Sequence, residues 1–448
     1  MEPSVIGSWG FGAALVLMIL RVPIAYVLVG VASVCSLLAY AWRPGGEFMF
    51  ERGLRPAMAL IESNAFDFIH SYSLSMIPLF IAAGHIAYHS RITTDIYEAV
   101  RVWLAKMPGG LAIASLFGCG GFSAITGSSL ACASSMGRIC VPEMLRFGYN
   151  KQLATSTVAM GGTLGSLIPP SVLFILYGMF TEQSVNKLFL AGVLPGILTI
   201  TGFIIVVVIW AMLKPGDAPA PKDLNFTGRD RLKAAIKGWP ALMLMTIIIG
   251  GIYGGFFTAT EAAAICLVFA LTFGVLSRRL TWEDFLSSMK ETAFQSASLF
   301  FIAIGAKIFV SFVSLTGVTG AFVDFVASLG LENWMVLFSI VLLYVVLGMF
   351  LDSIGTMLLT LPFVIPLVEG MGMDLIWFGV VVVKLLEIGL VTPPLGMNVF
   401  VINSVVTKEI KVHTIFFGVM KFLVADLIVL ALLVSFPIIS LLIPHSMG

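Results

Sequence analysis

The chain has 448 residues, of which 59% are hydrophobic and only 11% are charged, and its mean hydropathy is +1.05. Soluble domains carry roughly 25% charged residues, so this composition excludes an ordinary soluble protein and predicts an all-α protein that crosses the lipid bilayer many times. The net charge of +1 gives no indication of a nucleic-acid partner.

The first half of the chain, residues 1–213, predicts five crossings and one re-entrant hairpin. Arg21 and Pro23 divide its first apolar stretch into two crossings. The stretch read as a hairpin is rich in small residues, whose side chains let helices approach closely. In chain order we expect two crossings within 8–40, an interfacial helix over 56–70, a crossing over 73–88, the hairpin over about 109–145 with its tip at 126–129, a broken crossing over about 151–180 and a crossing over 188–213.

A basic linker, residues 214–239, separates this half from the second, residues 240–448. Its Lys and Arg residues are Lys214, Lys222, Arg229, Arg231, Lys233 and Lys237. In the second half we expect one crossing on each side of Gly254-Gly255, then an interfacial segment over 277–291 and a crossing over 293–314. These are followed by a hairpin over about 333–371 with its tip at Asp352-Ser353, a broken crossing over about 375–401 and a last crossing over 414–442.

The two halves carry the same landmarks at a constant offset of 224 residues, which indicates an internal duplication. The matching pairs are Pro142 and Pro366, Gly148 and Gly372, Gly165 and Gly389, and the Pro-Pro pairs Pro169-Pro170 and Pro393-Pro394. Lys and Arg flank the first hairpin, whereas Asp and Glu flank the second. Because Lys and Arg are enriched in cytoplasmic loops, we expect the basic linker in the cytoplasm, the first hairpin to enter from the cytoplasm and the second to enter from the opposite side. The segment 42–55, with Arg43, Arg52 and Arg55, does not fit this inverted orientation.

Inverted repeats with hairpins and broken helices are typical of secondary transporters. A Pro-Pro pair interrupts the helix, and the exposed carbonyls, together with hydroxyls, suit Na⁺, whereas helix N-termini suit an anion. The candidate oxygen-bearing residues are Ser128, Ser129 and Thr163 in the first half, and Asp352, Ser353, Thr356, Thr392 and Asn398 in the second. The alternative is that the hydroxyls only bond their own helix backbone.

Charged residues inside a membrane are candidates for function. We expect Asp352 to cap the second arm of its hairpin. Lys384 and Glu387 stand at i and i+3 and are expected to neutralise each other. Arg138 is expected to extend its head to the cytoplasmic face, and Lys307 has no assigned role.

The stretches 120–178 (GGFSAITGSSL… to …IPPSVLFILYG) and 347–401 (LGMFLDSIGTM… to …VTPPLGMNVFV) resemble the large membrane subunit of tripartite ATP-independent periplasmic (TRAP) transporters. The resemblance covers essentially the whole chain. It implies an elevator-type importer of small organic anions, such as carboxylates and sugar acids, in the bacterial inner membrane. Na⁺ would be the coupling ion, with no further cofactor. The implied partners are a small four-helix membrane subunit, here a separate chain, and a periplasmic substrate-binding protein.

The sodium sites that the resemblance implies lie at the hairpin tips and helix breaks. They correspond here to Ser128, Ser129, Gly162, Thr163 and Gly165, and to Asp352, Ser353, Gly389, Thr392 and Asn398. Arg138 departs from the family pattern, which more often has a small residue there.

Two alternatives remain open from the sequence. One is a stand-alone sodium/dicarboxylate symporter with the same fold. The other is an intramembrane hydrolase that uses Ser128 or Ser129 as nucleophile, which requires a His or Lys base nearby. His85 and His89 have no evident partner in the sequence, and the chain contains no nucleotide-binding motif.

Overall fold

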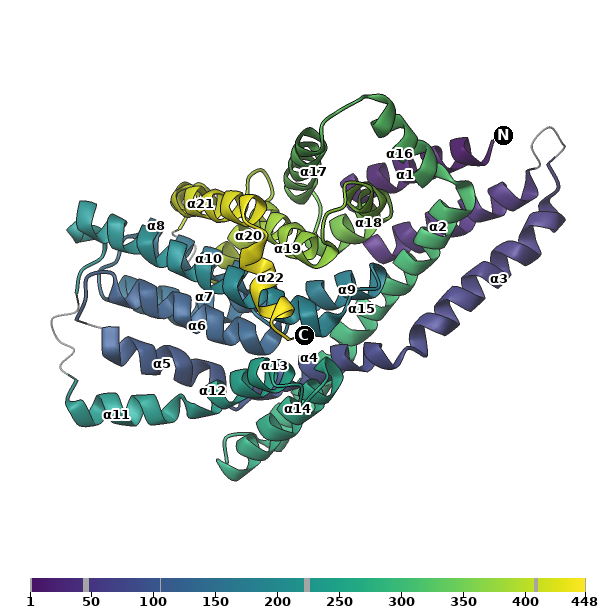
Figure 1. The fold of residues 1–448 in the computed structure, drawn as a ribbon. Coiled ribbons are helices and arrows are strands. Elements are labelled where there is room, and N and C mark those ends of the chain that lie inside the picture. The colour runs from purple at the N-terminus through teal and green to yellow at the C-terminus, as the bar shows by residue number, and fades with distance from the viewer. Residues whose placement is uncertain (1, 43–47, 105, 221–225, 407–409, 448) are drawn as a thin grey trace.

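A computed structural model describes residues 2–42, 48–104, 106–220, 226–406 and 410–447, and nearly all of them lie in helices (Figure 1). Six helices are long and apolar enough to cross a membrane, or up to eight if each of two bent helix pairs is counted as one span. The predicted polytopic helical class is therefore confirmed. The count of ten crossings stays a prediction.

The N-terminal helices agree with the predicted division at Arg21, whose φ is 64°: α1 covers Pro3–Ile19 and α2 covers Ile24–Ala41. The expected interfacial helix is longer than predicted, because α3 already begins at Phe50 and runs to Ile69. It continues through η1 (Tyr72–Ser75) into α4 (Met76–His89) with a bend of 59°. Arg43 lies outside the described residues.

The first predicted hairpin consists of α6 (Gly110–Thr126) and α7 (Ser129–Arg146). The first broken crossing consists of α8 (Lys151–Gly162), the short η2 (Thr163–Ser166) and α9 (Val172–Phe180). Residues 92–104, for which no helix was predicted, form α5 (Ile92–Leu104). This helix packs along α6. The crossing α10 covers Val185–Leu213.

The predicted linker contains η3 (Pro215–Asp217) and the helix α11 (Gly228–Lys237), and the Lys222 position lies outside the described residues. A capping box between Thr227 and Asp230 begins α11. This helix packs against α5, and Lys237 Nζ lies 3.6 Å from Glu98 Oε2. Part of the linker is therefore ordered helix attached to the first half.

The two crossings predicted around Gly254-Gly255 are confirmed as helical segments. The first is formed by α12 (Trp239–Met245), η4 (Thr246–Gly250) and α13 (Gly251–Tyr253), and the second is α14 (Ala259–Leu276).

The predicted separation of an interfacial segment, 277–291, from a crossing, 293–314, is wrong. A single helix of 35 residues, α15 (Trp282–Thr316), contains the interfacial segment from residue 282 on and the whole of the predicted crossing. It begins at a capping box between Thr281 and Asp284, and its sequence contains no proline that would interrupt the backbone hydrogen bonds. Polarity changes along α15, but the helix does not end where the polarity changes.

The second hairpin follows α16 (Val318–Ser328), which was not predicted, and consists of α17 (Asn333–Gly348) and α18 (Ser353–Gly370). The second broken crossing is α19 (Leu375–Val391) with α20 (Met397–Val405). The last predicted crossing, 414–442, ends earlier: α21 covers Val412–Ser435, and α22 (Ile438–His445) begins after Pro437. Proline has no N–H and so ends the backbone ladder there.

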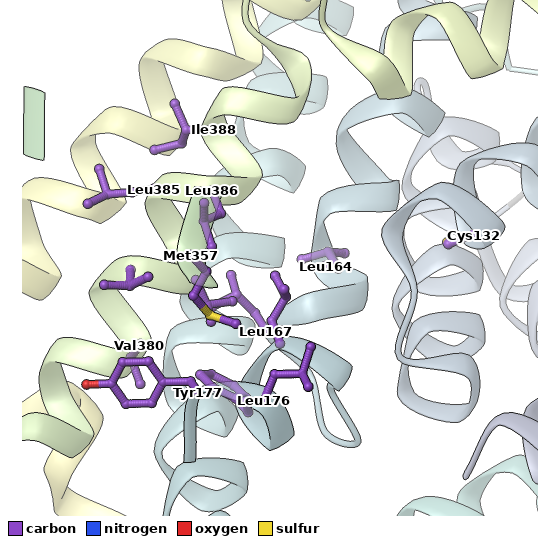
Figure 2. Close-up of a cluster of buried hydrophobic side chains, with 14 of the residues drawn as sticks. Cys132, Leu164, Leu167, Leu176, Tyr177, Met357, Val380, Leu385, Leu386 and Ile388 are labelled. Atoms are coloured by element: carbon purple, nitrogen blue, oxygen red, sulfur yellow. The ribbon is translucent and has the colours of Figure 1, made fainter. Parts of the chain in front are cut away.

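Helix α19 is the centre of the molecule, since every residue from Ile376 to Val391 is buried. It packs against both arms of the second hairpin and against α9, α10 and α21. In Figure 2, Tyr177 and Leu176 of α9 gather with Met357 of α18 and Val380 of α19 in one buried cluster. On one side of the molecule, α1, α2, α3 and α15 pack together, and α15 also packs against α4 and α18 (Figure 1).

Candidate functional site

The first hairpin tip, which we define as Gly127 and Ser128, rests on the break between α8 and α9. Gly127 has a φ of 62°, and a Cβ at this position would lie 2.6 Å from the carbonyl oxygen of Pro170. Only glycine combines that backbone conformation with so close an approach. Ser128 then begins α7 as its N-cap, with its Oγ accepting from the backbone N–H of Ala131 at 3.4 Å.

The glycines of the first break hold the same tip from the other side. A Cβ at Gly165 would lie 2.9 Å from the backbone nitrogen of Ser129, and one at Gly162 would lie 3.1 Å from the carbonyl oxygen of Ser129. The hydroxyl of Thr163 donates to the carbonyl of Met160 at 2.6 Å. The structure therefore brings Gly162 and Gly165 against Ser129, whereas the hydroxyl of Thr163 is bonded within its own helix.

The second hairpin tip, residues 349–352, ends at Asp352, and the predicted capping role of this residue is confirmed. Asp352 is the N-cap of α18, and its Oδ2 accepts from the backbone N–H of Gly355 at 3.3 Å. Its Oδ1 is buried and has no hydrogen-bond partner within the described chain. A carboxylate at a helix N-terminus faces unpaired amides and the positive end of the helix dipole.

The residues of the second break lie in two places. Gly389 touches the first arm of the second hairpin, because a Cβ there would lie 2.7 Å from the carbonyl carbon of Gly348. Thr392 donates to the carbonyl of Ile388 at 2.6 Å. Asn398 faces the first half instead, and its Nδ2 donates to the carbonyl of Ala159 on α8 at 3.4 Å. Both Pro-Pro pairs, Pro169-Pro170 and Pro393-Pro394, are in the cis form.

Several buried oxygens at these tips and breaks have no hydrogen-bond partner within the described chain. They are Asp352 Oδ1, Ser353 Oγ, Thr356 Oγ1, Glu387 Oε2 and Asn398 Oδ1. The alternative that hydroxyls only bond their own helix applies to Thr163 and Thr392, whose protons go to backbone carbonyls. Buried unpaired oxygens are costly unless a ligand satisfies them, and three of these residues, Asp352, Ser353 and Glu387, line one cavity, which indicates a binding region.

Both hairpin tips border one cavity of about 110 Å³. The polar residues that line it come from both halves of the chain and from α15: Ser128, Ser129, Ser166, Gln295, Asp352, Ser353 and Glu387. Of the predicted site residues, Gly162, Thr163, Gly165, Thr356, Gly389, Thr392 and Asn398 do not line this cavity. The helices α7 and α18 both begin at the cavity, so their N-termini border the same space as the unpaired oxygens of Asp352, Ser353 and Glu387.

The expected pairing of Lys384 with Glu387 is wrong. Lys384 forms an ion pair with Asp426 on α21 and donates to Thr199 Oγ1 on α10 at 3.1 Å. Glu387 instead accepts a hydrogen bond from Ser129 Oγ at 2.8 Å, and Ser129 Oγ lies 2.9 Å from Ser166 Oγ. Sequence analysis thus missed Glu387 as a residue of the tip cavity. Two signals were available in the sequence: its charge inside an apolar segment, and its position two residues before Gly389 in the break motif.

The histidines of α4 have acidic partners on α15 and are not paired with the serines of the first hairpin tip, as the sequence analysis expected. His85 Nδ1 lies 3.0 Å from Glu291 Oε2, and His89 Nδ1 lies 3.3 Å from Asp284 Oδ1, both on α15. Neither histidine is bonded to Ser128 or Ser129, and Ser129 is engaged by Ser166 and Glu387. The geometry therefore gives no support to a serine hydrolase. Arg138 and Lys307 are both exposed, which is consistent with the expected placement of the Arg138 head outside the protein interior.

The architecture defines the class of protein first. An all-helical fold with two hairpins and two interrupted helices around one polar cavity is the arrangement of a membrane transporter. The fold is also similar to the solved YdaH transporter of Alcanivorax borkumensis, with a TM-score of 0.61 over 100% of this chain and 98% of that chain, at 15% sequence identity.

The sequence comparisons define the family. The model of the "Tripartite ATP-independent periplasmic transporter, DctM component" matches residues 11–439, so the chain belongs to this family. It is 32% identical to the C4-dicarboxylate TRAP transporter large permease protein DctM of Pseudomonas aeruginosa, over 86% of this chain and 88% of that protein. It is 31% identical to the isethionate TRAP transporter permease protein DctMQ of Oleidesulfovibrio alaskensis, over 90% of this chain and 61% of that protein.

The resemblance found in the motifs is thereby confirmed. The chain is a large membrane subunit of a TRAP transporter, and its relatives are transporter permeases and not enzymes. Large permeases of this family work with a small membrane subunit and a periplasmic binding protein.

Proposed function

We propose that this subunit moves small organic anions, such as carboxylates and sugar acids, into the cell by Na⁺-coupled, binding-protein-dependent transport. The observation that carries the proposal is the single cavity bordered by both hairpin tips, with buried oxygens of Asp352, Ser353 and Glu387 that lack partners in the described chain. Oxygen ligands suit a hard cation such as Na⁺. The two helix N-termini at the same cavity suit the anionic group of a substrate.

The Na⁺ ions are proposed to bind where each tip meets its break. In the first half this is the region of Ser128, Ser129, Gly162, Thr163 and Gly165, where tip and break are in van der Waals contact. In the second half it is the region of Asp352, Ser353, Thr356, Gly389 and Thr392. Asn398 is proposed to serve the first region, because it lies against α8.

An elevator mechanism with inverted repeats is proposed for the movement. Its support is the constant offset of 224 residues between the two sets of landmarks, together with the packing of α1, α2, α3 and α15 on one side of the molecule (Figure 1). That group would stay fixed in the bilayer while the hairpins and broken helices move. The small membrane subunit is proposed to be a separate chain, and the complex to reside in the bacterial inner membrane.

The test is reconstitution of the chain with its small subunit and binding protein in proteoliposomes, with a panel of dicarboxylates, sugar acids and sulfonates. We expect uptake of one substrate class to require an inward Na⁺ gradient. Uptake at the full rate with K⁺ in place of Na⁺ on both sides would refute Na⁺ coupling. Full activity of the purified chain without either partner would favour a stand-alone symporter instead.

A further inference from the structure

Glu387 occupies an unusual position, because it connects the second half of the chain to the tip of the first hairpin. It lies on α19 with only 1% of its surface exposed, and its Oε1 accepts from Ser129 Oγ at 2.8 Å. Ser129 Oγ in turn lies 2.9 Å from Ser166 Oγ in the first break. Glu387 also borders the cavity between the two tips.

The charge of this carboxylate is not balanced by a neighbouring cation. The closest lysine along the helix, Lys384, is engaged with Asp426 and Thr199. No ion pair to Glu387 is present in the described part of the chain, and its Oε2 is buried without a partner. An uncompensated carboxylate inside a membrane protein costs several kcal/mol, so the carboxyl group needs either a counter-charge or a bound proton.

The cavity places a second carboxylate beside it. Asp352 lines the same cavity, and its Oδ1 is likewise buried and unpartnered. The volume of about 110 Å³ is well above the roughly 15 Å³ that one water molecule needs, so a small cation with some of its water fits there. Two carboxylates in one cavity also repel any anion that enters it.

We propose that Glu387 is a ligand for a monovalent cation bound in the cavity between the two hairpin tips, and that this cation must be present before an organic anion binds there. This inference rests on the proposed function. Without the cation, Glu387 and Asp352 exclude the anion by like-charge repulsion. With the cation, the repulsion is removed and the helix N-termini of α7 and α18 attract the substrate. Glu387 therefore couples transport of the organic anion to transport of the cation, and it limits transport of one without the other.

The test compares wild type with Glu387→Gln, which keeps the shape and the acceptor for Ser129 but removes the charge. Glu369→Gln serves as matched control, since it changes an exposed carboxylate at the far end of α18. The purified chain is first titrated with NaCl at constant ionic strength, with choline as replacement, and its thermal stability is measured. We expect wild type and Glu369→Gln to be stabilised by Na⁺, and Glu387→Gln to need at least tenfold more Na⁺ for the same shift.

Substrate counterflow in proteoliposomes of the complete transporter is the second measurement. We expect Glu387→Gln to show counterflow without Na⁺ and a Hill coefficient for Na⁺ lower by about one, whereas wild type and Glu369→Gln show no counterflow without Na⁺. If Glu387 is instead a neutral, protonated carboxyl group, the Gln variant keeps the wild-type Na⁺ dependence in both measurements, and the proposal is wrong. If Glu387→Gln folds poorly, Glu387→Asp replaces it, because aspartate keeps the charge on a shorter side chain. We then expect counterflow by Glu387→Asp still to require Na⁺, but at a higher Na⁺ concentration than wild type. Wild type that ignores Na⁺ in both measurements would refute the proposed function itself.

Discussion

Lys384 and Asp426 form an ion pair in which neither side chain has any exposed surface. They lie on α19 and α21, and Thr199 of α10 accepts a further hydrogen bond from Lys384. The pair thus joins three helices in the middle of the protein. Both side chains are buried, so removing the charge of one residue leaves the charge of the other buried without compensation.

We therefore expect Lys384→Met to lower stability by about 3–5 kcal/mol, and Asp426→Leu to do the same. The double variant Lys384→Met/Asp426→Leu is expected to recover most of this loss, since no unpaired charge is left. Thermal unfolding in detergent, followed at equal expression, measures the effect. A double variant no more stable than either single variant would show that the pair does more than balance charge.

Asp352 tests the role of the second tip. Asparagine is a good N-cap but carries no charge, whereas alanine caps poorly and costs about 1 kcal/mol. We expect Asp352→Asn to fold normally and to require more Na⁺ for half-maximal uptake, and Asp352→Ala to be both less stable and less active. Uptake is measured against Na⁺ concentration at matched expression. An unchanged Na⁺ dependence in Asp352→Ala would exclude this carboxylate from the ion site.

Gly389 tests the contact between the second break and its hairpin. A Cβ at this position would lie 2.7 Å from the backbone of Gly348, and backbone cannot move aside as a side chain can. We expect Gly389→Ala to separate α17 from α19 and to abolish most Na⁺-dependent uptake. Gly320→Ala on α16 is the control, because nothing lies within 4 Å of its added Cβ. Equal uptake by the two variants would show that the close packing is dispensable.

The opposite entry of the two hairpins is tested by cysteine labelling in intact cells. Arg146 and Glu369 lie at the C-terminal ends of α7 and α18, away from the hairpin tips, and both are exposed. We expect Glu369→Cys to react with a membrane-impermeant maleimide added outside the inner membrane, and Arg146→Cys to react only after the membrane is opened. Four of the five native cysteines are buried and one is partly buried, which keeps the background low. Labelling of both positions from one side would contradict the inverted repeat.

Local chemistry made the helix breaks and hairpin tips predictable. Proline removes a backbone donor, glycine accepts positive φ, and Ser or Asp caps a helix, and these effects act within a few residues. The tip at Gly127 and the cap at Asp352 were accordingly found where the sequence indicated. The end of the predicted interfacial segment, 277–291, was misplaced for a related reason: this segment runs on into α15, since a change of polarity does not break a helix that has no proline or cap there.

By itself, then, the amino-acid sequence determined that this is a polytopic helical membrane protein, and it located the residues that interrupt the helices. Only the tertiary structure decided the partners of the buried charges. Ser129 and Glu387 are 258 residues apart and Lys384 and Asp426 are 42 apart, yet each pair is in contact. The i and i+3 spacing of Lys384 and Glu387 allowed a pairing along one helix. In a fully buried helix, however, each side chain meets a different neighbouring element, so packing between helices selects its partner.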